Sequence, residues 1–246
     1  MKYKVVMMAL LLASLPFTQA AAEDNACWNW ALTPYLWGSS VTADLKLPQG
    51  QTTITKDAKF TDIISKLQMA FMGHVEGQGD NVGAFADIIY LSLGDNRNRE
   101  LYSSDSHMKS FIGELAGVWS PGEKRGEGIE PFAGLRYLSM KLDAEVDPVN
   151  PVYRPLKPSF NTAYTDVMVG LRYRGSFSDK WGYSVRGDGS WGGTNGIYTA
   201  SAIISYRLEK GEWDLGYRYM NIDLDASSNN LKLQMYGPIL AYTFKF

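Results

Sequence analysis

The residues of this chain that could form a site are mostly acids and bases on one face of alternating segments. When the residues of each segment are sorted by odd and even position, seven acids and seven bases fall on the polar face. Apolar Phe85 and Ile89 share that face with Asp87. Balanced charges in a narrow enclosed space are expected to pair, because an unpaired buried ion costs several kcal/mol. An open selective pore would instead carry rings of one sign. These fourteen residues are Glu76, Asp87, Glu114, Glu130, Arg136, Asp166, Arg172, Arg174, Arg186, Asp188, Arg207, Asp214, Arg218 and Lys245.

The two histidines are the other candidates for chemistry. His74 falls on the charged face and is expected to join its network; it has no second histidine nearby, so we predict no metal site. His107 follows a polar Ser103–Ser106 segment, where a general base would need a hydroxyl and an orienting acid within reach. Asp105 and Ser106 are adjacent, and neighbours on a strand point to opposite faces. We therefore predict no catalytic residue and no cofactor.

These side chains must be positioned by β-strands, because apolar and polar residues alternate along most of the chain. The predicted strands are 28–46, 67–78, 82–93, 107–120, 129–143, 162–177, 181–191, 197–208, 212–224 and 231–246. Four turns join them at 79–81, 121–128, 178–180 and 209–211, and five loops, each longer than the turns beside it, at 47–66, 94–106, 144–161, 192–196 and 225–230. Short turns face the periplasm in outer-membrane barrels and long loops face outside. Ten strands with both ends periplasmic is the prediction, and eight or twelve are the alternatives.

Alternation alone does not say which face points inward, since a soluble lipocalin-like barrel alternates too. Two features favour the membrane form. Most strands are ten or more residues long, which suits a tilted span. Aromatic residues also gather at strand ends next to short turns, as in an interfacial girdle. They are Trp28, Trp30, Trp119, Phe177, Trp181 and Trp213. The predicted fold class is all-β, a transmembrane antiparallel up-and-down β-barrel.

The N-terminal residues are expected to be an export signal, with Lys2 and Lys4, an apolar run and small residues ending at Ala22. We assign 1–22 to a signal peptide and 23–246 to a single barrel domain. Without the two lysines, 22 basic residues face 26 acidic ones, a net charge of −4. This acidity argues against nucleic acid as a partner. Cys27 is the only cysteine, so no internal disulfide is expected.

The last strand alternates up to a terminal aromatic residue, with Tyr242, Phe244 and Phe246 on one face. In this respect the chain resembles small bacterial outer-membrane barrels, in the broad sense of the outer-membrane protein A transmembrane domain and its relatives. Segments 33–37 and 60–64 look like those of a group of uncharacterised proteobacterial barrels. The resemblance implies a bacterial outer-membrane location, contact with outer-membrane lipid and lipopolysaccharide, and recognition of the last strand by the outer-membrane assembly machinery. It transfers no functional residue.

Two local features stand apart from the strand pattern. Pro34 and Pro238 lie at similar depth on the first and last strands, and each removes a donor from a ladder. One hypothesis is a locally unzipped seam that gives lipids or apolar ligands lateral access; the alternative is two tolerated bulges.

Apolar residues at 60, 63, 64 and 67 predict a short helix that caps the lumen or lies on the membrane surface.

The function expected from these features is an envelope-integrity, surface or binding role for a barrel with a mostly closed, charge-paired lumen. The alternative is a narrow channel or a carrier for small or apolar solutes. An enzyme that modifies lipid A or cleaves peptides ranks third. The sequence does not indicate an oligomeric state.

Overall fold

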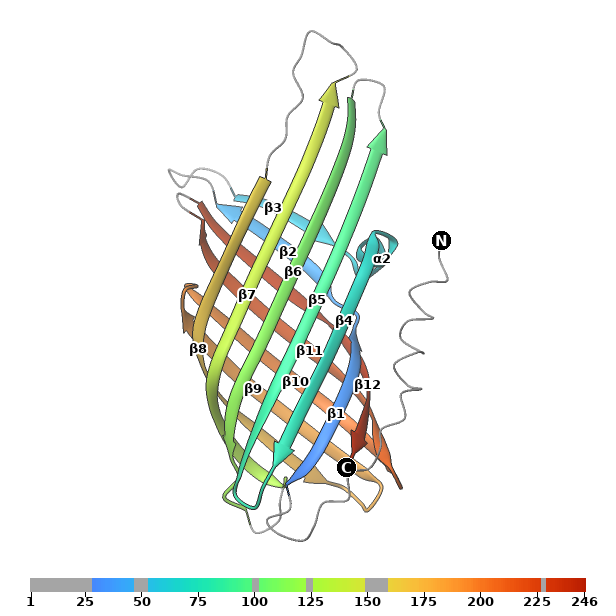
Figure 1. Cartoon of the computed structure of the whole chain (residues 1–246), viewed down its shortest axis with the longest axis vertical. Coiled ribbons are helices and arrows are strands. Elements are labelled where there is room, and N and C mark those ends of the chain that lie inside the picture. The colour runs from blue at the N-terminus through green and yellow to red at the C-terminus, as the bar shows by residue number, and fades with distance from the viewer. Residues whose placement is uncertain (1–27, 47–52, 99–101, 123–125, 149–158, 227–228) are drawn as a thin grey trace.

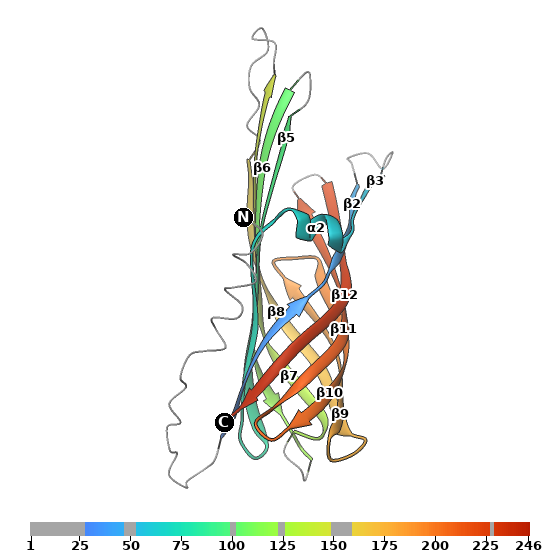
Figure 2. The same cartoon turned by 90° about the vertical axis from the view of Figure 1, so that its right-hand side faces the viewer.

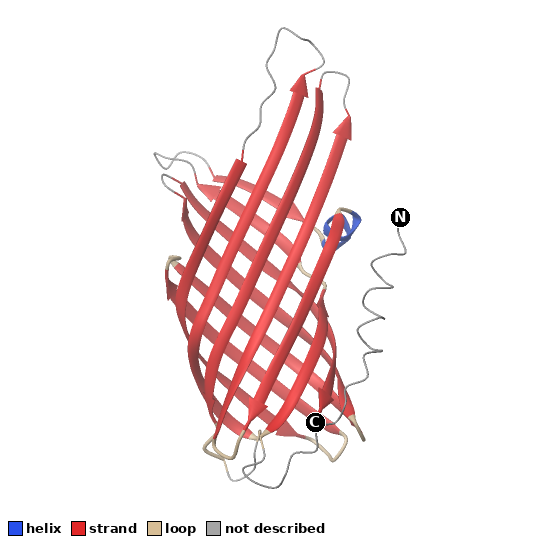
Figure 3. Ribbon diagram, in the orientation of Figure 1, coloured by secondary structure: helices blue, strands red, loops and turns tan. Residues whose placement is uncertain are grey.

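The computed structural model in Figure 1 describes residues 28–46, 53–98, 102–122, 126–148, 159–226 and 229–246. The expected signal peptide and Cys27 lie outside these ranges. The described chain is nearly all strand, as Figure 3 shows. Among the described residues, no helix is long and apolar enough to cross a membrane.

The strands close into one antiparallel barrel with ten strand positions, as predicted. β1 (Asn29–Trp37) and β2 (Ser40–Lys46) share the first position, because both pair with the last strand, β12 (Asn229–Lys245). The eight between are β4 (Leu67–Gln78), β5 (Val82–Asn98), β6 (Tyr102–Trp119), β7 (Gly128–Pro148), β8 (Ser159–Ser176), β9 (Trp181–Gly192), β10 (Gly196–Leu208) and β11 (Gly211–Ala226). Each pairs with its neighbour along the chain.

The first strand position differs from its prediction. Residues 28–46 do not form one uninterrupted strand, because the ladder breaks at Gly38 and Ser39. The predicted loop 47–66 also contains structure, namely β3 (Thr53–Ala58), which pairs with β2, and the helix α2 (Phe60–Ser65). The sequence of β3 has no regular alternation of apolar and polar residues, so the strand was not predicted; it forms by pairing with β2.

The helix α2 confirms the apolar periodicity seen in the sequence. None of its residues is buried, and Phe60 is 40% exposed. The N–H of Phe60 donates to Ser40 Oγ at 3.2 Å, and the Phe60 ring lies beside Gly38. The outward-facing Pro238 lies against the same glycine. The helix therefore lies against the outer side of the barrel, which corresponds to the membrane-surface alternative.

Three strands extend well beyond the rest, as Figures 1 and 2 show. β5, β6 and β7 have 17, 18 and 21 residues, against 12 in β9. They occupy much of the predicted loops 94–106 and 144–161, which are correspondingly shorter. Within this extension the Ser159 hydroxyl donates to Asp143 at 2.8 Å. That bond, with the Lys141 ammonium, lowers the pKa of the Asp143 carboxyl.

The exterior is apolar and the aromatic girdle is present. Large apolar side chains are exposed along the outward face of the strands, including Leu36, Phe71, Leu115, Leu135, Val167, Leu171, Ile204, Leu215 and Leu240. Trp28, Trp30, Trp119, Phe177, Trp181 and Trp213 are exposed at the end with the short turns. Such a band with a girdle is the lipid-facing surface of a membrane barrel, and the short turns mark the periplasmic end.

Candidate functional site in the barrel lumen

Alternation along each strand places the charged face inside the barrel, as β7 illustrates. Glu130 and Arg136 are buried in the lumen, whereas Leu135 and Tyr137 face outward. Since every strand has this two-residue period, inward side chains from distant segments meet across the lumen. The fourteen predicted network residues all belong to described strands, and their contacts differ with height.

A cluster at mid-height centres on Arg136, which is 1% exposed. Its guanidinium donates to Glu114 Oε1 at 2.7 and 2.9 Å and also to the Asp188 carboxylate. Arg186 donates to the same two carboxylates, at 2.8 Å to Glu114 and 2.7 Å to Asp188. Ser190 accepts a further bond from Arg136 at 3.1 Å. Two arginines and two acids thus form a neutral, hydrogen-bonded core, which is the geometry that buried ions need.

A second cluster lies nearer the periplasmic end. Arg172 donates two bonds to Glu76, at 2.7 and 2.8 Å, and one to Glu130 at 2.7 Å. Arg174 donates to both acids, at 3.2 and 2.7 Å, and to Gln78 at 2.7 Å. This cluster is again balanced, and the bidentate Arg172–Glu76 contact fixes its geometry.

His74 links Asp87 to the second cluster, and Tyr35 links Asp87 to Arg218. The two ring nitrogens of His74 lie 3.2 Å from Asp87 and 3.4 Å from Glu76. The Tyr35 hydroxyl donates to Asp87 at 2.7 Å, and Arg218 donates to that hydroxyl at 3.3 Å. Tyr35 was not predicted, because the inward face of its strand carries no charge that would have marked it.

The remaining predicted residues do not join these clusters. Asp166 accepts from Thr194 and Ser190 in the upper lumen. Asp214 accepts from Ser205 and from Thr243, the latter at 2.7 Å. Hydroxyls, rather than cations, satisfy both acids.

Arg207 and Lys245 lie at the periplasmic rim, where both approach Glu212. The Arg207–Glu212 distance is 3.9 Å and the Lys245–Glu212 distance is 2.8 Å. Glu212 was not predicted, because it is the first residue of its predicted strand, next to the turn 209–211.

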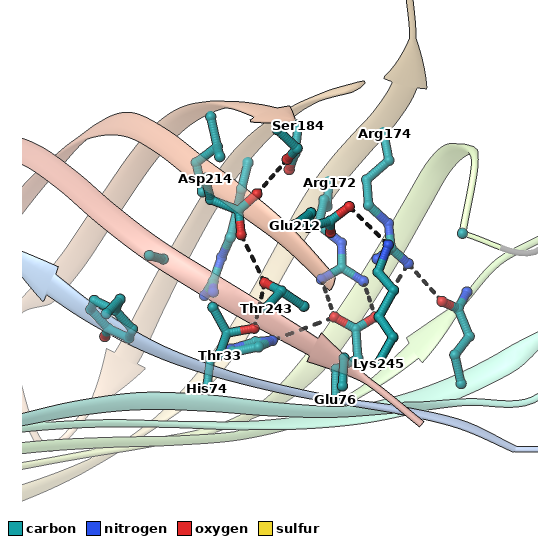
Figure 4. A pocket seen from close by; sticks show the side chains of 18 of the residues that line it. Thr33, His74, Glu76, Arg172, Arg174, Ser184, Glu212, Asp214, Thr243 and Lys245 are labelled. Atoms are coloured by element: carbon teal, nitrogen blue, oxygen red, sulfur yellow. Dashed lines mark hydrogen bonds and ion pairs between the residues drawn. The ribbon is translucent and has the colours of Figure 1, made fainter. Parts of the chain in front are cut away.

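A cavity of about 690 Å³ occupies the periplasmic part of the lumen. Figure 4 shows the polar side chains that line it, from Thr33 on the first strand to Lys245 on the last. Its lining extends from rim residues such as Asn29 and Phe246 up to Tyr35 and Arg218. The charges of the lower cluster therefore border a space that water can fill from the periplasm.

The upper lumen holds a different kind of side chain. A buried apolar cluster, here called the apolar plug, lies above the Arg136 cluster. Four methionines belong to the plug or pack against it. Its residues are Tyr35, Trp37, Ile89, Ile112, Leu138, Met140, Ile197, Met220, Ile222, Leu224, Ile239 and Ala241, with Met72, Tyr164, Leu231, Leu233 and Met235 packed against them.

The predicted assembly-signal residues form a row of rings on the last strand. The Tyr242 ring lies 4.7 Å from that of Phe244 and 5.0 Å from that of Trp213. Phe246 exchanges two backbone bonds with Trp30. Recognition by the assembly machinery stays a prediction.

The closing seam joins β1 and β2 to β12, and its local unzipping at the two prolines stays a hypothesis. The missing N–H groups of both prolines belong to this seam. The backbone N–H and C=O groups of even-numbered β1 residues are directed toward β12, as the two Trp30–Phe246 bonds show. β12 keeps one register along β1 and β2, from Ala31↔Lys245 to Lys46↔Asn230, but ladder pairs are missing at Thr33 and Pro34 and at Gly38 and Ser39. Three pairs join the strands between the two prolines. A longer interruption lies on the other side of β1, toward β4, where pairing ends at Pro34↔Gly73.

The second histidine has an acid partner but lies far from the lumen network. His107 Nδ1 is 3.4 Å from Asp105 in the extracellular extension, and both side chains are 48% exposed. Ser106 donates to the backbone oxygen of Asp95 instead. In the described part of the chain, no group of three or more potential metal ligands is arranged to hold an ion.

No protein-family model and no curated protein sequence matches the chain. Among solved structures, the attachment invasion locus protein Ail of Yersinia pestis has a TM-score of 0.35 at 9% identity, covering 87% of this chain and 97% of that one. Protease OmpT of Escherichia coli has 0.35 at 8%, covering 93% and 100%. OprG of Pseudomonas aeruginosa has 0.35 at 12%, covering 90% and 96%. Scores this low carry no argument about function. On its own closed ladder, apolar exterior and aromatic girdle, the chain is a ten-stranded bacterial outer-membrane β-barrel.

Proposed function

We propose that this protein is a non-conducting outer-membrane barrel with a binding role at the cell envelope. Two stacked layers of buried side chains in the lumen support the proposal. The Arg136 cluster is paired by short hydrogen bonds, and the apolar plug lies above it. An ion crossing the barrel would have to break these pairs and then enter an apolar layer, where its desolvation is unfavourable.

A surface role is supported separately by the extracellular extension. β5, β6 and β7 keep pairing far above the girdle, up to Asn98↔Ser103 and Tyr102↔Pro148. A sheet that projects from the membrane presents backbone edges and polar side chains to external partners. Such edges are recurrent sites of strand addition.

Planar-bilayer recording tests the closure. The folded protein should show no steady openings. A variant in which Leu138, Ile222 and Trp37 are all replaced by alanine removes large side chains from the plug and should show more frequent openings. The matched control replaces three outward residues, Leu135, Leu215 and Leu36, by alanine and should stay silent.

Steady conductance by the unmodified protein would contradict the proposal and favour the narrow channel. The heat-dependent shift in electrophoretic mobility that folded barrels show is the check that each variant is folded. Silence of the plug variant, with the fold intact, would mean that the charged layer is a sufficient barrier by itself.

A further inference from the structure

The ladder between β1 and β4 ends halfway up the barrel. Pairing runs from Asn29↔Gln78 to Pro34↔Gly73 and goes no further. The next hydrogen-bonded pair would join Tyr35 to Met72. Above it, the described ladders pair β4 only with β5, while β2 pairs with β12 and β3. Figure 2 shows β1 and β2 crossing obliquely away from the long strands β5 and β6.

The backbone of Trp37 shows that this break is built into the chain. Its N–H donates to Met72 Sδ at 3.3 Å, and its carbonyl accepts the N–H of Ser39 at 2.9 Å. Neither bond belongs to a ladder. On the opposite side, Gly38 donates to the Pro238 carbonyl at 2.9 Å, which keeps the β12 register. Lipid offers no bonds to an unpaired backbone group, so these substitutes stabilise an edge that faces the bilayer.

Both inward side chains at the break belong to apolar surroundings. Trp37 is part of the apolar plug, and Met72 packs against it. Methionine is unbranched and adapts its shape to different contacts, which suits a lining that must part and close again. A hydrocarbon chain that entered between β1 and β4 would therefore meet apolar, deformable side chains.

Arg218 lies at the inner end of this path and differs from the other arginines at and below mid-height. Among the described residues, no carboxylate lies within 4.0 Å of its guanidinium, whereas Arg136, Arg172, Arg174 and Arg186 each contact two. Its Nε is buried without a hydrogen-bond partner. Its Cζ lies 5.4 Å from the Tyr35 ring and 5.5 Å from the Trp37 ring. A cation with an unused donor thus borders the apolar path.

We propose that the break between β1 and β4 is a binding site for a long-chain fatty acid that enters sideways from the outer leaflet. Its chain lies against Trp37 and Met72, and its carboxylate accepts from Arg218. An intact lipid fits less well, because its head group stays at the bilayer surface while Arg218 is deep in the lumen. α2 lies next to the break, with Phe60 against Gly38, and must shift or tilt to admit the chain. The site goes beyond the closed-lumen role and does not depend on it.

Saturation binding of radiolabelled palmitic acid to the folded protein in phosphatidylcholine nanodiscs tests the proposal. We expect saturable binding that unlabelled palmitic acid displaces at least ten times more effectively than hexadecanol. Arg218→Met should weaken palmitate binding about tenfold, which corresponds to about 1.4 kcal/mol. Lys180→Met, in an exposed periplasmic turn, is the matched loss of a cation and should leave binding unchanged.

A second variant keeps the proposal falsifiable if Arg218→Met does not fold. Met72→Trp fills the break and should reduce palmitate and hexadecanol binding together. Three results would overturn the proposal: binding that never saturates, equal displacement by acid and alcohol, or an unchanged affinity in both folded variants. Displacement of palmitate by added lipopolysaccharide at lower concentration than by unlabelled palmitic acid would assign the site to intact lipid and also reject the proposal. Conductance is measured independently, so this failure leaves the closed-lumen proposal standing.

Discussion

The lower and upper halves of the lumen are filled by opposite kinds of side chain, although the same strands supply both. β7 contributes Glu130 and Arg136 below and Leu138 and Met140 above, all on its inward face. Of the lower charges, Glu76, Arg172 and Arg174 line a cavity that reaches the periplasmic rim, whereas the upper side chains are packed against one another. Charges thus lie where water or a partner can satisfy them, and the upper layer is mostly apolar, with Asp166 held there by the hydroxyls of Ser190 and Thr194.

The largest loss of stability is expected where a buried cation contacts two buried carboxylates. Arg136→Ala removes one of the two arginines that Glu114 and Asp188 share and leaves both carboxylates to Arg186 alone. Breaking a buried pair in this way costs about 3–5 kcal/mol. Urea unfolding in lipid vesicles, followed by tryptophan fluorescence, measures it.

A charge-neutral control separates pairing from packing. Replacing Arg136 by Met together with Asp188→Asn removes one charge of each sign and keeps the volume, so it should lose less than Arg136→Ala. If Arg136→Ala costs under about 1 kcal/mol, the mid-height cluster is hydrated and the contrast between the halves fails.

In the apolar half, Leu138→Ala should cost about 2–3 kcal/mol, toward the lower part of the range for such truncations. Met140 shares its face and can move into part of the space. The same unfolding assay applies. Leu135→Ala is the matched control on the outward face, where the side chain is 51% exposed and lipid can replace the lost contact. Equal losses at the two positions would show that the plug is not a packed layer.

Much of the barrel could be predicted from the sequence because its signals are local. Alternation identifies the strands, turn residues separate them, and parity places Arg136 and Glu114 on the inward face. Parity does not say which inward residues meet, since that depends on register and tilt. The plug illustrates this limit: Leu138 and Met140 continue the parity of Arg136, but only height within the barrel groups them with Ile222.

The break beside β1 was missed for a similar reason. The two prolines drew the hypothesis to the β12 seam, where each removes one donor from an otherwise constant register. The decisive residues are Gly38 and Ser39, which carry no periodic signal. The extension of β5–β7 was missed because a polar strand outside the membrane has no apolar face to alternate.

The smallest effect is expected at the periplasmic rim, where charges are paired but exposed. Lys245 is 51% exposed at its side chain and lies 2.8 Å from Glu212, which Arg207 also approaches. Water screens such a pair and another cation remains, so Lys245→Ala should cost about 0.2–1 kcal/mol. Added salt should shrink that difference further, while the loss in Arg136→Ala should persist because its partners are buried. Unfolding of both variants at low and high salt gives the comparison. A loss of stability at Lys245 as large as that at Arg136 would mean that the rim charges belong to the buried network. The boundary between hydrated and water-free charges would then lie below the mouth of the cavity rather than above it.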